Sequence, residues 1–265
     1  MSQTYITFHR GAVQGICAAE LEPHLAFFTE GFEAWLTGRP TRIFLERPNQ
    51  VFGIQLPPEV FDVGTPVVIK RFGWRSSVHR LARPLTGSKA IRSFRIAMTL
   101  WEAGVATPRP LIAWDREDGG GGPVSYYITE EIPDVVTLRQ TLKSPGMTET
   151  ERRTLLNELA RLVRGMHDAG ILHRDLTIGN FLVAPKPVDG DRIFIIDLSR
   201  AVHLGRIPLP LRFMDLARMK LLDLWPEFFE RYCEGQPDWK AYRPVLNILI
   251  RIRRWRMNLK KSLKV

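Results

Sequence analysis

The 265-residue sequence contains only two cysteines, Cys17 and Cys233, and they lie far apart. This excludes a disulfide framework and a zinc site of clustered thiols, and it predicts two reduced thiols. The sequence lacks a run of about 18 apolar residues, so we expect no membrane-spanning helix. The N-terminus lacks a basic start followed by an apolar run, so we expect no signal peptide.

Acidic residues are in the minority, and the formal net charge is +10. An excess of positive charge favours anionic partners: nucleic acid, an anionic membrane surface or a phosphorylated substrate. Without a nucleic-acid-binding motif beside the charge, we predict no nucleic-acid partner.

Residues 247–265 contain no acidic residue at all. As a helix, this segment places apolar side chains on one face, with arginines and lysines around them, and the apolar residues are Ile248, Ile252, Trp255, Leu259 and Leu263. A basic amphipathic helix of this kind suits an anionic bilayer surface. The alternative, compatible with the first, is a closing helix packed on the second half of the chain.

The first half of the chain has the pattern of a small antiparallel sheet. Stretches rich in β-branched and aromatic residues predict strands at 42–46, 51–56, 66–72, 111–115 and 124–132. Between them, residues 87–104 predict one helix that ends at Gly104, with an apolar stripe of Ile91, Phe94, Met98 and Trp101.

The second half changes to a helical pattern. Thr148 and Glu151 have capping-box spacing at the start of a helix that Gly170 ends, with an apolar stripe of Leu155, Leu159, Leu162, Val163 and Met166. A loop, the short strand 192–197 and further helices follow. We therefore predict an α+β protein of two lobes: an N-terminal extension (1–40) packed on a first lobe (41–132), and a helical second lobe (133–265).

The loop HRDLTIGNFLV (173–183) carries the chemistry. In phosphoryl transfer, Asp175 is suited to accept a hydroxyl proton, and the oxygens of Asn180 and Asp197 are suited to hold Mg²⁺. The strand residue Lys70 is suited to contact phosphates. Each residue has an ordinary alternative, namely an exposed strand lysine, turn-forming Asp and Asn, or a helix cap. Their joint order along the chain favours phosphoryl transfer.

With these residues in place, the sequence resembles the protein-kinase-like superfamily, and within it the bacterial lipopolysaccharide kinases that phosphorylate heptose or Kdo. The segments VVIKRF, EAGVATPRPL, ITEEI, HRDLTIGNFLV, FIIDLSRA and MDLARM carry the resemblance. It implies ATP and Mg²⁺ as cofactors, Glu130 and Ile132 in the adenine-binding linker, and Asp215 as a brace of the loop. It also implies a lipopolysaccharide core glycolipid as acceptor, and a cytoplasmic protein peripheral on the inner face of the cytoplasmic membrane.

Three features depart from the kinase pattern. Residues 47–53 contain only Gly53 where a glycine-rich loop is expected, and the helix position for a lysine-pairing glutamate falls near Ser93. Only residues 198–214 separate Asp197 from the next helix, which favours a small or glycolipid acceptor over a protein. Two rival functions remain: another small-molecule kinase resembling the aminoglycoside phosphotransferases, and a nucleotide-binding pseudokinase.

Overall fold

The computed structural model describes residues 5–39, 41–46, 49–61, 66–73, 88–116 and 124–262. The chain divides into two compact units. The first comprises Met1–Glu102 with Pro108–Ile132, and the second comprises Ala103–Thr107 with Pro133–Val265. Within the described part, no helix is both long enough and apolar enough to cross a membrane.

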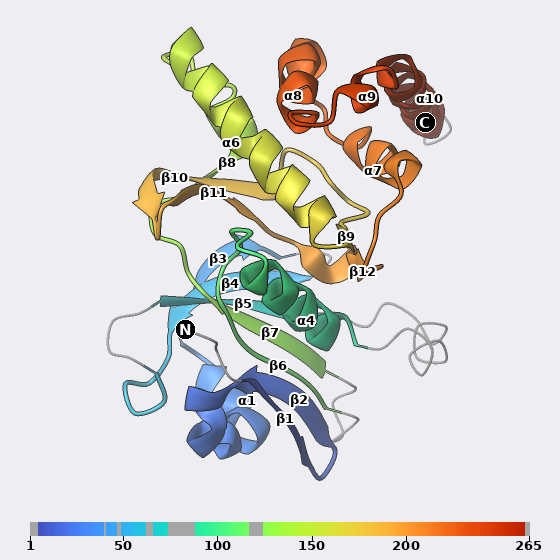
Figure 1. The fold of residues 1–265 in the computed structure, drawn as a ribbon. Helices are drawn as coiled ribbons and strands as arrows, with labels where there is room; N and C mark the ends of the chain where they lie inside the picture. The colour runs from blue at the N-terminus through green and yellow to red at the C-terminus, as the bar shows by residue number, and fades with distance from the viewer. Residues whose placement is uncertain are drawn as a thin grey trace. The chain divides into compact units, whose positions relative to one another are not determined.

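The first unit is built on an antiparallel sheet (Figure 1). Its described strands number seven, in the order β1-β2-β6-β7-β5-β4-β3. Their bounds are β1 Tyr5–Arg10, β2 Val13–Ala18, β3 Arg42–Leu45, β4 Gln50–Gln55, β5 Pro66–Phe72, β6 Pro110–Arg116 and β7 Val124–Glu130. The predicted meander of β3, β4 and β5 is confirmed, because β4 pairs with both neighbours in antiparallel register.

Helices cover both faces of this sheet. Helix α4 (Lys89–Glu102) packs on one face, where the Phe94 ring lies 6.5 Å from that of Tyr127. On the other face lie η1 (Ala19–His24), η2 (Phe27–Gly31) and α1 (Phe32–Leu36), and the Phe32 ring meets Trp114 and Tyr126 at 5.1 and 5.2 Å. Consecutive strand residues point to opposite faces, so Tyr126 and Tyr127 fill two different cores.

The helix predicted within residues 87–104 is confirmed, and Gly104 follows its end with φ of 68°. The predicted apolar stripe was shifted, however. Ala90, Phe94, Ala97 and Leu100 are buried, whereas Trp101 is exposed. The small side chains of Ala90 and Ala97 let the helix approach the sheet closely. The predicted stripe missed this face because it was drawn through large apolar residues only.

The second unit centres on helix α6 (Glu149–Asp168), which begins with the predicted capping box of Thr148 and Glu151. Of the predicted stripe, all residues except the half-buried Leu162 are buried. The other elements are β8 Val136–Thr137, α5 Leu138–Thr141, β9 Ile171–Leu172, β10 Phe181–Val188, β11 Asp191–Ile195, η3 Leu198–Arg200, β12 Val202–His203, α7 Leu209–Leu216, η4 Leu222–Leu224, α8 Trp225–Tyr232, α9 Pro237–Lys240 and α10 Arg243–Ser262.

Short strands in this unit hold the loop between β9 and β10. Strands β11, β10 and β8 form one small sheet, and β12 pairs with β9 in another. Between α6 and β9, Gly170 adopts φ of 75°, and a Cβ there would lie 2.3 Å from the carbonyl oxygen of Gly205. Only glycine fits this close approach, which fixes where β9 begins.

Candidate functional site

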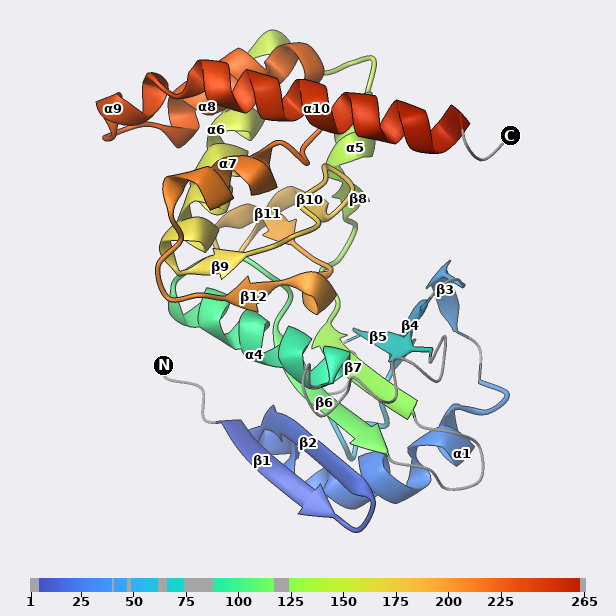
Figure 2. The same ribbon diagram turned by 90° about the vertical axis from the view of Figure 1, so that its right-hand side faces the viewer.

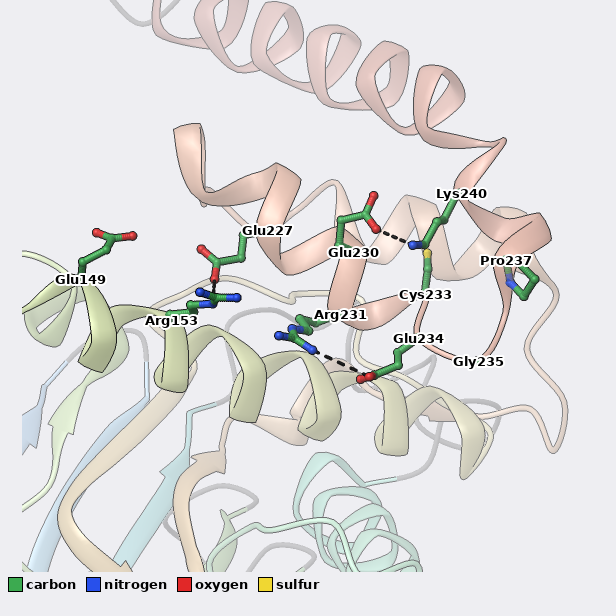
Figure 3. Close-up of a pocket in the computed structure, with 10 residues that line it drawn as sticks. All are labelled: Glu149, Arg153, Glu227, Glu230, Arg231, Cys233, Glu234, Gly235, Pro237 and Lys240. Carbon is green, nitrogen blue, oxygen red and sulfur yellow. Dashed lines mark ion pairs between the residues drawn. The ribbon is translucent and has the colours of Figure 1, made fainter.

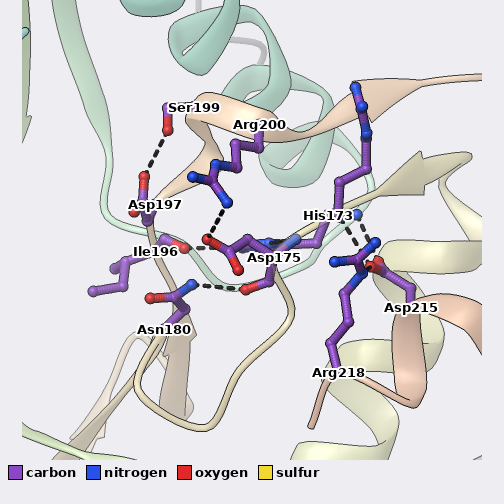
Figure 4. A network of polar contacts seen from close by, with 10 residues as sticks. His173, Asp175, Asn180, Ile196, Asp197, Ser199, Arg200, Asp215 and Arg218 are labelled. Atoms are coloured by element: carbon purple, nitrogen blue, oxygen red, sulfur yellow. Dashed lines mark hydrogen bonds and ion pairs between the residues drawn. The ribbon is translucent and has the colours of Figure 1, made fainter. Parts of the chain in front are cut away.

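The buried side chain of Asp215, on α7, holds the turn that carries Asp175. Its Oδ2 accepts a hydrogen bond from the backbone N–H of His173 at 2.7 Å, and its Oδ1 accepts one from Arg174 at 2.9 Å (Figure 4). Arg174 has φ of 64°, a left-handed conformation that costs a non-glycine residue on the order of 1–3 kcal/mol. The two hydrogen bonds therefore stabilise a backbone turn that is unfavourable by itself, as the resemblance implied for Asp215.

The His173 ring ties the loop to the strand that precedes Asp197. The backbone N–H of Asp175 donates to His173 Nδ1 at 3.3 Å, so the proton of the ring lies on Nε2. Nε2 then donates to the carbonyl oxygen of Ile196 at 3.0 Å. A fully buried ring thus connects the backbone of the predicted base to the residue before the predicted metal ligand.

A second buried histidine supports Asp215 from α6. His167 Nδ1 lies 2.7 Å from the Tyr232 hydroxyl, while Nε2 lies 3.6 Å from Asp215 Oδ2, beyond hydrogen-bond distance. Burial lowers the pKa of His167, because removal from water disfavours the charged ring, and the nearby Arg212 lowers it further, whereas Asp215 opposes both. The His167 ring is therefore uncharged and packs beneath the loop.

Asn180 and Asp197 are the predicted magnesium ligands, and each carries a side-chain oxygen. The Asn180 amide nitrogen donates to the Asp175 carbonyl oxygen at 2.8 Å, which leaves the amide oxygen as its ligand atom. Asp197 directly precedes η3 with φ of 58°, and its Oδ1 accepts a hydrogen bond from Ser199 at 2.8 Å. The described residues contain no cluster of three or more His, Cys, Asp and Glu side chains able to hold a metal. Two oxygen ligands completed by phosphates and water suit Mg²⁺.

An arginine that the sequence reasoning did not single out lies against the predicted base. Arg200 Nη1 is 3.2 Å from Asp175 Oδ2, and its side chain is 68% exposed, whereas that of Asp175 is 30% exposed. Figure 4 shows Arg200 reaching from η3 to the carboxylate. The sequence DLSR gave no signal of this pair, because it joins residues that are distant along the chain.

The other predicted site residues belong to the first unit. Lys70 lies on β5, with Nζ 5.2 Å from the centre of the Phe72 ring. Ser93, the position expected for a lysine-pairing glutamate, is buried, and its hydroxyl donates to the Lys89 carbonyl oxygen. Position 93 of α4 is therefore part of the packed interior of the first unit.

The predicted adenine-binding linker follows β7. Glu130 pairs with Arg109 at 2.6 Å, and Arg109 also pairs with Glu20 at 2.6 Å. Ile132 is buried. Between them, the Glu131 carboxylate accepts a hydrogen bond from Arg42 on β3.

The Arg42–Glu131 pair lies over the one glycine of the segment where a glycine-rich loop was expected. A Cβ at Gly53 would meet a carboxylate oxygen of Glu131 at 3.0 Å and the Arg42 guanidinium at 3.3 Å. Gly53 therefore makes room for an ion pair within the unit.

The C-terminal helix α10 runs alongside α7, and its C-terminal half extends past that helix (Figure 2). Its own residues Leu246 and Ile250 are buried. Of the predicted apolar face, Ile248, Ile252 and Trp255 are exposed, at 54, 44 and 63%. The side chain of Leu259 and the whole of Leu263 lie outside the described part of the chain.

Arg253 is one of the arginines that flank the predicted apolar face of α10. Its side chain is half-buried, and burial lowers the pKa of its guanidinium, as does the neighbouring Arg218, whereas Asp175 and Asp215 raise it. Arg253 therefore lies within electrostatic range of the loop. One side of α10 packs on the second unit, as expected of a closing helix, and an apolar side remains exposed, so membrane binding stays a prediction.

A groove of about 660 Å³ lies among α6, α8 and α9 (Figure 3). None of the predicted site residues lines it. Three of its four glutamates pair with its three basic side chains, as Arg153–Glu227, Arg231–Glu234 and Lys240–Glu230, and Glu149 is the fourth. A groove with more acidic than basic side chains offers little attraction to an anionic nucleotide, so it carries no functional argument.

Comparisons with known proteins identify a family of kinases that this chain resembles. The model of the lipopolysaccharide kinase (Kdo/WaaP) family matches residues 71–232. The chain is 33% identical over 174 residues to lipopolysaccharide core heptose(I) kinase WaaP of Pseudomonas aeruginosa, which covers 62% of this chain and 64% of the relative. It is 30% identical over 116 residues to 3-deoxy-D-manno-octulosonic acid kinase of Vibrio parahaemolyticus, which covers 43 and 44%. The chain thus spans less than two thirds of either relative.

A solved structure of WaaP in complex with acyl carrier protein matches with a TM-score of 0.55 and 24% identity, over 83% of this chain and 97% of that one. This likeness confirms the predicted α+β, protein-kinase-like fold.

Proposed function

Because this chain belongs to the lipopolysaccharide kinase (Kdo/WaaP) family, we propose that it is an ATP-dependent kinase that phosphorylates a sugar hydroxyl, of heptose or Kdo, in the lipopolysaccharide inner core. The observation that carries the proposal is the hydrogen-bonded unit of Asp175, Asn180 and the strand that leads to Asp197. Phosphoryl transfer depends on positioning and charge neutralisation; such a unit supplies the positioning, and its oxygens would hold the Mg²⁺ that neutralises charge.

In this proposal, Asp175 accepts the proton of the acceptor hydroxyl. Its backbone is held by His173, and its carboxylate is partly exposed, so an acceptor can reach it. Asn180 and Asp197 would hold Mg²⁺, which when bound neutralises phosphate charge. Lys70 would contact the phosphates of ATP, and Glu130 and Ile132 would line the adenine.

Replacement of the base tests the function directly. We expect Asp175→Asn to abolish phosphate transfer from ATP to purified lipopolysaccharide core while ATP binding persists, because the base contacts the acceptor and not the nucleotide. Asp189→Asn, in an exposed turn, is the matched control and should retain activity. Near-normal turnover by Asp175→Asn would end the kinase proposal.

The same assays separate the rival functions. An aminoglycoside-phosphotransferase-type kinase would phosphorylate a soluble amino sugar in preference to the core glycolipid. A pseudokinase would bind ATP without consuming it. Asp197→Ala should lose Mg²⁺-dependent ATP binding, measured by calorimetry with and without Mg²⁺, and retention of that dependence would remove Asp197 from the metal site.

We also propose that the exposed face of α10 binds the anionic surface of the inner membrane, so that the protein is cytoplasmic and peripheral. The exposed residues Ile248, Ile252 and Trp255 recur at helical spacing, and no acidic residue occurs in 247–265. Each arginine or lysine near an anionic surface contributes about 1 kcal/mol to the free energy of binding. Because the proposed acceptor is linked to lipid, binding to the membrane would bring the protein close to its substrate.

Cosedimentation with vesicles tests this surface. Trp255→Ser combined with Ile252→Ser should reduce binding to anionic vesicles, and Leu204→Ser, which replaces an exposed apolar residue in the loop after β12, should not. Binding should also weaken as salt rises, because salt screens the attraction. If the double variant binds vesicles normally but no longer binds acyl carrier protein, the partner in the solved WaaP complex, then the face is a protein-binding surface and the membrane proposal is wrong.

A further inference from the structure

The proposed reaction develops negative charge that the side chains between Asp175 and Asn180 cannot neutralise by themselves. The acceptor oxygen forms a bond to the γ-phosphorus of ATP, the bond from that phosphorus to the bridging oxygen of ADP breaks, and the hydroxyl proton passes to Asp175. The negative charge spreads over the oxygens of the phosphoryl group during transfer. Residues 175–180 are Asp, Leu, Thr, Ile, Gly and Asn, so this segment contains no cationic side chain.

Arg200 is a cation that the fold brings into contact with the carboxylate of Asp175. Its Nη1 lies 3.2 Å from the carboxylate of Asp175. Its backbone belongs to η3, the short helix that begins directly after Asp197. The Ser199 hydroxyl, from the same helix, donates to Asp197 at 2.8 Å. The helix therefore connects the predicted metal ligand with the predicted base.

The distances of the reaction place the phosphoryl group within reach of this side chain. A hydroxyl bonded to the Asp175 carboxylate lies about 2.7 Å from it. A hydroxyl ready for attack lies roughly 3–3.5 Å from phosphorus. The phosphorus is then within about 6 Å of the carboxylate that Arg200 already contacts. Because the Arg200 side chain is 68% exposed, it can turn from Asp175 to the phosphoryl oxygens without repacking the core.

We propose that Arg200 is a further catalytic residue, an arginine supplied within the same chain that binds the oxygens of the transferred phosphoryl group. This inference rests on the proposed kinase function. Before the acceptor arrives, Arg200 pairs with Asp175; the acceptor hydroxyl takes its place at the carboxylate, and the guanidinium moves to the phosphoryl group. The planar guanidinium matches two phosphoryl oxygens at once, which an ammonium group does not.

Steady-state kinetics with ATP and lipopolysaccharide core give the first test. We expect Arg200→Gln to lower kcat by about 10²- to 10³-fold, with the KM values for ATP and acceptor unchanged, because the contact forms only in the transition state. Arg200→Lys should be intermediate. Arg206→Gln, an exposed arginine in the turn after β12, removes the same charge and should behave as the wild type. A raised KM for the acceptor with normal kcat would assign Arg200 to an anionic group of the acceptor and overturn the proposal.

Binding of ADP with aluminium fluoride, which mimics the transferring phosphoryl group, gives the second test. Arg200→Gln should weaken binding of this complex by at least about tenfold, while the affinity for ADP alone stays constant. A loss of kcat with unchanged affinity for ADP–aluminium fluoride would show that Arg200 only positions Asp175, and would refute the proposal.

The two proposals also fail in different ways. If the wild-type protein binds ADP–aluminium fluoride but does not phosphorylate the core, the proposal that lipopolysaccharide core is the acceptor is wrong. The effect of Arg200→Gln on binding of the fluoride complex can still be measured. A wild-type protein that binds neither ADP nor its fluoride complex disproves both.

Discussion

Replacement of Asp215 by alanine should destabilise the second unit and loosen the loop that carries Asp175. The carboxylate is 1% exposed and accepts two backbone hydrogen bonds, from His173 and Arg174. Each buried donor left without a partner costs about 1–3 kcal/mol, so the two together cost roughly 2–6 kcal/mol. The pair with Arg218 adds little, because that guanidinium retains access to water. We therefore expect Asp215→Ala to lower the free energy of unfolding by about 3 kcal/mol.

Urea denaturation followed by tryptophan fluorescence measures this loss, with Asp223→Ala as the control because Asp223 is exposed on η4. Without Asp215, the left-handed turn at Arg174 has lost its restraints, so kcat should fall even at temperatures where the variant is folded. A stability change below about 1 kcal/mol would show that the N–H groups of His173 and Arg174 find other partners, and would refute this explanation. Full activity in a destabilised variant would show that the turn does not depend on Asp215.

Three further changes follow from single contacts. Gly170→Ala should destabilise much more than Gly190→Ala in thermal unfolding, because both glycines have positive φ but only the Cβ at 170 would strike Gly205; equal losses would mean that the backbone relaxes. Thr148→Ala should cost about 0.5–2 kcal/mol in urea titration through loss of the capping box, and no loss would show that the helix start is held elsewhere. The pKa of buried His167 is lowered, so the unfolded chain binds its proton first and stability falls as pH drops below about 6.5. His167→Gln should flatten this fall in urea titrations from pH 7.5 to 5.5, and an unchanged slope would assign it to other groups.

Local features of the fold could be predicted from sequence. The capping box of α6 depends on two residues three positions apart, and the strands β4 and β5 depend on runs of β-branched residues. The hairpin of β1 and β2 was not predicted as strands, because its pairing with β6 joins residues about a hundred positions apart. For α10, sequence periodicity indicated the apolar face but not which side of the helix packs on the protein, which contacts with α7 decide.

The candidate site shows the same division. The order of Asp175, Asn180 and Asp197 indicated phosphoryl transfer, because each chemical role needs a particular side chain. The positive φ angles of Arg174 and Asp197 carry no sequence signal, since neither residue is a glycine. The Arg200 contact depends on how η3 folds back toward the loop, so only the three-dimensional structure reveals it.

The pairing of β2 with β6 has a practical consequence for anyone who shortens this protein. β2 covers the edge of β6 from Ile112 to Arg116, and Phe28 and Phe32 cover the Trp114 ring. A fragment that starts at residue 41 would present the backbone of a long, apolar strand to other molecules, and such edges template aggregation. We expect that fragment to be insoluble on expression, so recombinant work on this protein should keep the N-terminal hairpin.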